Sequence, residues 1–363
     1  MERSKRILII QTAGIGNVVL LTPFLKNIRE NFIFSKITLI TSSSTCSEII
    51  SLTKLVDEIR ISTFKPIKIK DIGLKSIKEY FSLIKLLRKG KYCIVFITFP
   101  SPGFYYPLAT YLSRIPLRIG HEYKLRNKIS HLFLTHHVKL SYDHEINLNL
   151  DLQKKVNLEI RNFYPFLPKN EHFLDNNFIR IGIHTGSSNG MELKRWGNDK
   201  FILLCKKIFE NHSNVIISFF GTCSDEFNMD EKLKEKYAKQ LNDYVGTLSI
   251  RDTINKISDC NLFISNDSGL MHIANALGLN IIAIFGPTDE KITGPINNKI
   301  NKIIIIRSEQ KCKCFYVPGT NLLNMKCNFL KPCLTEITVD QVYNATLTVI
   351  EKLNTKKTKF ERV

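Results

Sequence analysis

The sequence predicts an α/β protein of two doubly wound domains that face each other across a cleft. Apolar segments of strand length alternate with segments of helical periodicity along the chain, as in parallel sheets covered by helices. A second such series begins after the proline-containing stretch at residues 164–170, and a length of 363 residues suits two domains. We place the N-terminal domain at residues 1–168 and the C-terminal domain at residues 169–363.

The N-terminal series begins with a strand, a glycine-containing loop and a helix. The expected strands are residues 6–11, 36–41 and 93–99. The first helix follows the loop at residues 12–17, and Pro23 is expected to kink it. A helix at residues 74–89 has one apolar and one basic face. The basic face is expected to be the solvated side of a sheet-packing helix, with contact to anionic lipid as the alternative.

The C-terminal series repeats this alternation. The expected strands are residues 179–184, 214–220, 262–265 and 281–285, and the expected helices are residues 197–211, 231–241, 270–277 and 338–353. The last helix opens with Thr338 and Gln341 at the spacing of a capping box. Gly278 ends the helix at residues 270–277, because glycine readily adopts the left-handed conformation found after helices.

The formal charge of +19 is unevenly distributed. Residues 1–170 hold 27 Lys and Arg against 12 Asp and Glu, a net of +15, whereas residues 171–363 hold 25 against 21, a net of +4. The basic half favours an acidic partner: nucleic acid, an anionic membrane surface or an acidic glycolipid. Nucleic acid has the least support, since the chain lacks interleaved aromatic residues and any known binding module. A lysine-rich surface that is merely solvated is the remaining alternative.

Cysteine content predicts a reduced, cytoplasmic protein. The nine cysteines are an odd number, and the N-terminal apolar run ends at Ile10, which is too short for a secretory signal. No apolar run approaches the roughly 18 residues of a membrane span. A cluster near the C-terminus consists of Cys312, Cys314, Cys327 and Cys333. Zinc is one interpretation, but the spacing is not a pair of C-x-x-C hooks, so we expect reduced thiols and no metal.

The turn after the expected strand at residues 262–265 is a candidate anion site. It holds Asn266, Asp267, Ser268 and Gly269, followed by a helix. A helix N-terminus beside the carboxyl end of a parallel strand attracts anions. His272 lies one turn inside that helix, where its side chain leans back toward the turn. The alternative is that Asp267 or Ser268 only caps the helix.

Two more loops follow strands of the same domain. Thr185 belongs to a polar loop at residues 184–188, which is followed by the cations Lys194 and Arg195. Asp225 and Glu226 come after the next strand, and a carboxylate there suits ribose hydroxyls. The alternative for the first loop is that it is merely exposed to solvent. The alternative for Asp225 and Glu226 is that they only cap a helix. Together, a phosphate cradle, a cation and a carboxylate predict a nucleotide diphosphate site.

The first glycine loop does not match known nucleotide motifs. Gly14 and Gly16 are followed by Val19, where a dinucleotide fingerprint requires a third glycine. A P-loop is missing from the sequence, and so is a D-x-D motif that would hold a nucleotide sugar through a metal. Nicotinamide chemistry and P-loop ATPase activity are therefore excluded.

Several short motifs resemble the bacterial heptosyltransferase family, glycosyltransferase family 9, over nearly the whole chain. The matching pieces are Gly14-Ile15-Gly16-Asn17-Val18-Val19 with Thr22-Pro23, Arg118-Ile119-Gly120, His144-Glu145 with Asn149, Lys194-Arg195-Trp196, Ser265-Asn266-Asp267-Ser268-Gly269 with His272, and Phe285-Gly286-Pro287-Thr288-Asp289. The resemblance implies a GT-B fold, with the acceptor on the N-terminal domain and an ADP-activated sugar on the C-terminal domain. It further implies inverting transfer of a heptose to lipopolysaccharide core, without metal or cofactor, at the inner face of the cytoplasmic membrane.

The resemblance also implies roles for individual residues. The diphosphate contacts fall on Lys194, Ser268, Gly269 and His272. The donor carboxylates fall on Asp267 and on Asp225 or Glu226.

One position departs from the family pattern. The family's Gly-Asp, whose Asp is the proposed base, is Gly16-Asn17 here, and a neutral amide cannot accept a proton. We therefore consider His121, Glu122 and His144 as proton acceptors. The alternative is a catalytically inactive GT-B scaffold that keeps the nucleotide site.

Overall fold

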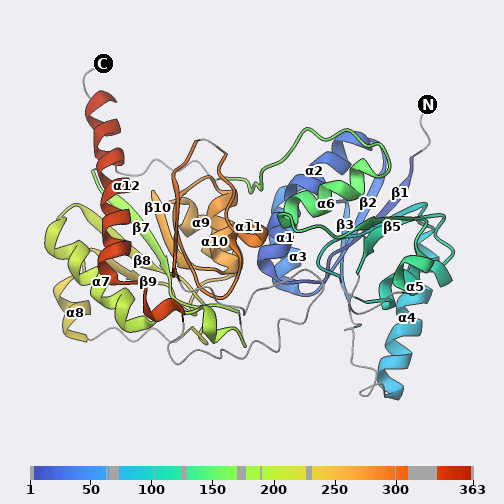
Figure 1. Cartoon of the computed structure of the whole chain (residues 1–363), viewed down its shortest axis with the longest axis horizontal. Coiled ribbons are helices and arrows are strands. Elements are labelled where there is room, and N and C mark those ends of the chain that lie inside the picture. Colours follow the sequence, from blue (N-terminus) through green and yellow to red (C-terminus); the bar gives the residue numbers. More distant parts are fainter. Residues whose placement is uncertain are drawn as a thin grey trace. The chain divides into compact units, whose positions relative to one another are not determined.

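The protein divides into two compact units in the computed structural model (Figure 1). The structure describes residues 4–62, 64, 73–101, 103–123, 129–169, 177–188, 190–225, 231–298, 300–309 and 333–360. The division falls between Pro165 and Phe166. Each unit contains one parallel sheet of six strands, so the predicted α/β class with two doubly wound sheets is confirmed.

The sheet of the N-terminal unit has the strand order β3-β2-β1-β4-β5-β6. Its strands are β1 (Arg6–Ile10), β2 (Lys36–Thr41), β3 (Glu58–Ile61), β4 (Ile94–Ile97), β5 (Leu117–Glu122) and β6 (His136–Lys139). The sequence predicted β1, β2 and β4 but missed the other three. The edge strands β3 and β6 are four residues each, and polar residues make up half of β3 and three quarters of β6, so they lack the apolar run of a buried strand.

Helices cover both faces of this sheet. They are α1 (Ile15–Leu20), α2 (Thr22–Asn31), α3 (Ser44–Thr53), α4 (Leu74–Gly90), α5 (Tyr105–Leu112) and α6 (Glu145–Lys154), with a short 3₁₀ turn, η2, at Ser130–Phe133. Figure 1 shows α4 and α5 together on one side of the sheet, and α1, α2, α3 and α6 pack together on the other. The expected kink is a full break at Leu21, and Pro23 lies in the first turn of α2, where its missing N–H costs nothing.

The sheet of the C-terminal unit has the order β12-β11-β10-β7-β8-β9, which is the same arrangement. Its strands are β7 (Ile179–His184), β8 (Val215–Phe219), β9 (Leu241–Asp243), β10 (Leu262–Asn266), β11 (Asn280–Phe285) and β12 (Ile303–Arg307). The sequence missed β9 and β12. Residues 231–241 were predicted as one helix, which is wrong: the helix ends at Lys236, and Leu241 pairs with Ile217 of β8. That pairing is a long-range contact, which local periodicity cannot show.

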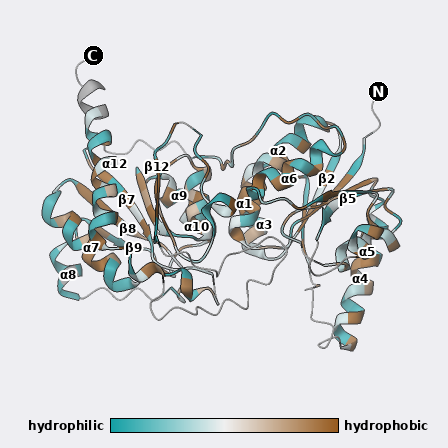
Figure 2. Cartoon of the chain, in the orientation of Figure 1, coloured by the Kyte–Doolittle hydropathy of each residue, from teal (hydrophilic) through white to brown (hydrophobic). Residues whose placement is uncertain are grey.

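The helices of this unit also lie on both faces of the sheet. They are α7 (Asn198–Asn211), α8 (Glu231–Lys236), α9 (Ile250–Ser258), α10 (Gly269–Ala276), α11 (Glu290–Thr293) and α12 (Val339–Phe360), with 3₁₀ turns η3 (Glu192–Lys194) and η5 (Cys333–Thr335). Side chains of α7 and α12 share one core with the sheet, whereas α9 packs against α10. The central strands are hydrophobic along their length (Figure 2), because both of their faces are buried.

Strand order identifies where each unit can bind a ligand. In a doubly wound sheet, ligands bind at the carboxyl ends of the two strands between which the chain reverses its direction of winding. Those strands are β1 and β4 in one unit, and β7 and β10 in the other. Within the described ranges, none of the helices combines the length and the apolar composition that crossing a membrane requires.

Candidate functional site

Asn266, the last residue of β10, joins three segments of the C-terminal unit. Its side-chain Nδ2 donates to the carbonyl oxygens of Thr185 at 2.6 Å and Gly186 at 3.2 Å, both in the loop after β7. Its Oδ1 accepts the backbone N–H of Trp196 at 3.0 Å. Asn266 is fully buried, so these bonds are not exchanged with water. The amide therefore fixes the Lys194-Arg195-Trp196 segment against the ends of β7 and β10.

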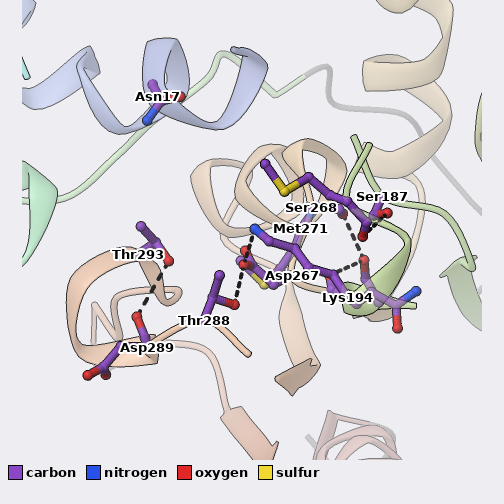
Figure 3. A network of polar contacts seen from close by, with 12 residues as sticks. Asn17, Ser187, Lys194, Asp267, Ser268, Met271, Thr288, Asp289 and Thr293 are labelled. Carbon is purple, nitrogen blue, oxygen red and sulfur yellow. Dashed lines mark hydrogen bonds and ion pairs between the residues drawn. The ribbon is translucent and has the colours of Figure 1, made fainter. Parts of the chain in front are cut away.

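Asp267 is the next residue, and its carboxylate is the centre of a polar cluster (Figure 3). Its Oδ2 lies 2.6 Å from Nζ of Lys194 and accepts the Thr288 hydroxyl at 2.7 Å. Lys194 follows β7 and Thr288 follows β11, the two strands that flank β10 in the sheet. The cluster is thus assembled from the carboxyl ends of three adjacent strands, which the sequence presents far apart.

Burial and charge act in opposite directions on Asp267. Burial alone would raise the pKa of this carboxyl, but the charges of Lys194 and His272, with hydrogen bonds from Lys194 and Thr288, hold the pKa below its usual range. Asp267 is therefore ionised at neutral pH, and its negative charge keeps the Lys194 ammonium at this edge of the sheet. His272 is itself buried in the first turn of α10.

Ser268 is the N-cap of α10. Its backbone is extended, and its Oγ accepts the N–H of Met271 at 3.3 Å, as Figure 3 shows. A second contact joins its hydroxyl to that of Ser265 at 3.0 Å. Of the two capping alternatives, the cap is thus Ser268, whereas Asp267 holds a cation. Gly269 begins the helix, whose N-terminal N–H groups lie beside the cluster and favour an anion there.

The third predicted loop, which follows β8 and contains Asp225, is held by contacts within its own turn. Asp225 is buried, and its Oδ2 accepts the N–H and the hydroxyl of Thr222 at 2.8 and 3.0 Å. Nη2 of Arg195 lies 3.8 Å from its other carboxylate oxygen. A Cβ on Gly186 would come within 1.9 Å of the Asp225 carboxylate, so only glycine fits at that position. Asp225 stabilises its own turn and packs against the loop after β7, whereas Glu226 lies outside the described residues.

In the N-terminal unit, Asn17 makes two sets of contacts at the carboxyl end of β1. Its Oδ1 accepts the N–H of Gly14 at 3.1 Å, which satisfies the backbone donor of the N-cap residue of α1. Its Nδ2 donates to both carboxylate oxygens of Glu145, at 2.9 and 2.8 Å. Asn17 therefore caps its helix, which was the structural alternative, and also binds a carboxylate from α6. Gly16 lies in the first turn of α1.

From the sequence, Glu145 is named only as part of a family-like motif and is not considered as a proton acceptor. It is fully buried at the first position of α6, and burial raises its pKa to about 8, although the Asn17 amide acts in the opposite direction. The family-like His144-Glu145 pair contains it, but nothing local distinguishes it from the usual acidic residue in the first turn of a helix.

The other acceptor-side candidates each have a structural contact. His121 is buried in β5 beside Phe99 and Tyr123, and burial lowers its pKa to about 3, so its imidazole is neutral. Glu122 accepts from Nδ1 of His137 at 3.1 Å. His144 caps α6, where its Nδ1 accepts the N–H of Ile146 at 3.2 Å.

The cysteine cluster falls mostly outside the described residues, which include only Cys333 of its four members. Cys333 is a buried thiol that packs in the core of the C-terminal unit. Among the described side chains, His, Cys, Asp and Glu do not gather in groups of three or more that could hold a metal ion.

Known proteins resemble this chain in sequence. The family model for glycosyltransferase family 9 (heptosyltransferase) matches residues 81–318. Lipooligosaccharide heptosyltransferase 2 of Haemophilus influenzae is 29% identical over 133 residues, which is 36% of this chain and 37% of that relative. The enzyme of the same name from Campylobacter jejuni is 31% identical over 138 residues, or 38% of this chain and 43% of the relative. The chain thus aligns with only about two fifths of the length of these curated relatives.

Solved structures resemble it in fold. ADP-heptose lipopolysaccharide heptosyltransferase II of Escherichia coli gives a TM-score of 0.71 at 18% identity, covering 97% of this chain and 99% of that one. A family 9 glycosyltransferase from Veillonella parvula gives 0.73 at 21% identity over the same shares, and E. coli heptosyltransferase WaaC with ADP gives 0.64 at 17% identity over 96% and 99%. At these identities the likeness shows the fold, which is GT-B. Because the family model matches well over half of the chain, this protein belongs to glycosyltransferase family 9, the heptosyltransferase family.

Proposed function

We propose that the protein transfers a heptose or a related sugar from an ADP-activated donor to lipopolysaccharide core or a similar glycolipid, with inversion and without a metal ion. The observation that carries this proposal is the Lys194–Asp267–Thr288 cluster at the N-terminus of α10. It stands at the position where a doubly wound sheet binds ligands, in a chain of this family. The sequence relatives are heptosyltransferases, which supports heptose, and the WaaC structure with ADP supports the nucleotide.

The C-terminal unit is proposed to bind the donor. The diphosphate would lie against Ser268, Gly269 and the Lys194 ammonium, with His272 beside it. A helix dipole contributes at most about 2 kcal/mol, whereas micromolar affinity requires about 8 kcal/mol. Lys194, burial of the base and contacts to the sugar hydroxyls must therefore supply most of the affinity. Thr185 and Asp225, after β7 and β8, are the proposed residues on the sugar and ribose side.

The N-terminal unit is proposed to bind the acceptor, near Gly14, Gly16 and Asn17. Its net charge of +15 over residues 1–170 is the supporting observation, because the phosphorylated core of a glycolipid is strongly anionic. The charge also supports a cytoplasmic enzyme that works at the inner face of the cytoplasmic membrane.

Helix α4 is the proposed membrane contact. Leu74 and Phe81 are 79% and 65% exposed, an unusual degree for large apolar side chains in an amphipathic helix. Lys75 and Lys78 are exposed between them. Figure 2 shows the hydrophobic colour persisting at the end of α4 that projects from the sheet. Apolar side chains interleaved with lysines are typical of a helix that lies on anionic lipid.

An ADP-release assay tests the proposed function. The purified protein is incubated with a panel of nucleotide sugars and truncated lipopolysaccharide cores, and free ADP is measured. We expect release only when an ADP-sugar and a matching core are both present. Binding of ADP without release for every pair would overturn the proposal and favour the inactive scaffold, which the names of the relatives do not support.

A further inference from the structure

Glu145 is a buried carboxylate held by an amide. Both of its oxygens accept from Nδ2 of Asn17, and its side chain is completely buried, whereas Asn17 is only half-buried. Removing a carboxylate from water is costly, and proteins usually compensate the cost with a cation. Here the Asn17 amide and the N-terminus of α6 offset only part of that cost. Such an arrangement keeps the carboxylate basic.

The surroundings of Glu145 support this basicity. Tyr123, just after β5, is buried and accepts the N–H of Ser101 at 2.8 Å through its hydroxyl oxygen. Burial first, and then the negative charge of Glu145, raise the pKa of Tyr123, so the phenol stays neutral. His144, which precedes Glu145 in the chain, caps α6 through its Nδ1.

We propose that Glu145 accepts the proton of the acceptor hydroxyl during sugar transfer and that Asn17 positions its carboxylate. This inference rests on the proposed function. Asn17 stands where the family pattern has its acidic residue and cannot itself accept a proton. Its Nδ2 lies 2.9 and 2.8 Å from the two oxygens of Glu145, so one N–H is shared between them, and the acceptor hydroxyl takes over one oxygen while the amide keeps the other oriented.

The step is a simple displacement. The O–H bond of the acceptor breaks, and its proton moves to one oxygen of Glu145. The hydroxyl oxygen forms a bond to the anomeric carbon of the donor, and the bond from that carbon to the diphosphate breaks. Its electron pair leaves with ADP. A base with a pKa near the working pH suits this role, and Glu145 has a pKa of about 8.

In this chain the pair combines one carboxyl group with one amide. An Asn17→Asp change would place two carboxylates in direct contact, and one of them would then hold a proton. We therefore expect Asn17→Asp to lower turnover at neutral pH rather than to raise it. Exchanging the two groups, in Asn17→Asp/Glu145→Gln, restores one carboxylate and one amide in reversed order.

Four variants test the inference: Glu145→Gln, Asn17→Asp, the exchange variant Asn17→Asp/Glu145→Gln, and Asp151→Asn as a matched control on the same helix. The measurements are kcat for ADP release across the pH range, ADP affinity by calorimetry, and thermal unfolding. We expect Glu145→Gln to lower kcat by about 10²–10⁴-fold without changing ADP affinity. The exchange variant should have a kcat at least about tenfold higher than that of Glu145→Gln. Asp151→Asn should have the kcat of wild type. The wild-type rate should rise with pH through about 8, where Glu145 ionises.

The outcomes separate this inference from the proposed function. An active wild type with a fully active Glu145→Gln overturns the role of Glu145 and leaves the proposed function standing. A wild type that releases no ADP overturns both. If Glu145→Gln does not fold, the exchange variant decides, because it rebuilds the amide–carboxylate pair. An exchange variant that folds and binds ADP but stays at least about 10²-fold slower than wild type at every pH also overturns the inference.

Discussion

The ammonium of Lys194 lies 2.6 Å from Oδ2 of Asp267, and their side chains are only 17% and 6% exposed. Thr288 donates to the same oxygen, so this one carboxylate atom holds the cation with the help of a hydroxyl. Asp267 thereby positions the Lys194 ammonium next to the N-terminus of α10, and the ammonium and the helix N-terminus each favour a phosphate group.

Removing the cation should weaken nucleotide binding. Lys194→Ala is expected to cost about 1.5–3 kcal/mol of ADP affinity, as for a charge-assisted hydrogen bond, which calorimetry can measure. Lys234→Ala is the matched control, since Lys234 also pairs with a carboxylate, Glu231, at 3.0 Å in the same unit. Unchanged ADP affinity in Lys194→Ala would remove Lys194 from the donor site.

Removing the carboxylate should reduce stability. Asp267→Asn leaves Lys194 buried beside a neutral amide, and breaking a buried pair in this way typically costs about 3 kcal/mol. Asp340→Asn, which breaks an exposed pair with Lys207, should cost less than about 1 kcal/mol. Urea unfolding measures both values, and equal losses in the two variants would contradict the buried ion pair.

The same pair predicts a pH dependence. The pKa of Asp267 is lowered on folding, so its contribution to stability is fully present above the unfolded pKa near 3.8 and is lost as pH falls through the folded pKa. The difference in unfolding free energy between wild type and Asp267→Asn should therefore be constant at neutral pH and shrink below about pH 4. If this difference in unfolding free energy persists unchanged to the lowest pH at which the protein folds, the pairing with Lys194 does not lower the pKa of Asp267.

Glu145 predicts the opposite trend. Its pKa rises on folding from 4.5 to about 8, so the unfolded chain releases this proton first. Its contribution to stability is therefore present below pH 4.5 and declines as pH rises through about 8. Denaturant unfolding of wild type at pH 5 and pH 9 should show the loss, and Glu145→Gln should show a smaller one. Identical losses in the two proteins would mean that the folded state does not perturb this carboxyl.

Helix α4 should mediate binding to anionic vesicles. Binding should fall steeply with salt, since exposed charges are screened over about 8 Å at physiological ionic strength. Lys75→Glu/Lys78→Glu should lower vesicle affinity at least about tenfold, because each lysine near the surface contributes about 1 kcal/mol. Lys236→Glu/Lys239→Glu, on the C-terminal unit, makes the same charge change and should have little effect. Equal binding to neutral and anionic vesicles would contradict an electrostatic contact.

The sequence by itself determined the class of the fold and the turn at the donor site. The buried central strands are continuous apolar runs, and the turn of Asn266, Asp267, Ser268 and Gly269 has residue types that fix a helix start locally. Both signals depend on neighbours within a few residues. The short edge strands lack such a signal, since they become strands only by pairing with the rest of the sheet.

Only the tertiary structure decided which groups meet. Lys194 and Asp267 are 73 residues apart, and Asn17 and Glu145 are 128 apart. Their contacts follow from the order of strands in each sheet, because that order brings particular loops to one edge. The same folding removes Glu145 from water and raises its pKa, an effect of burial that residue type and spacing do not encode.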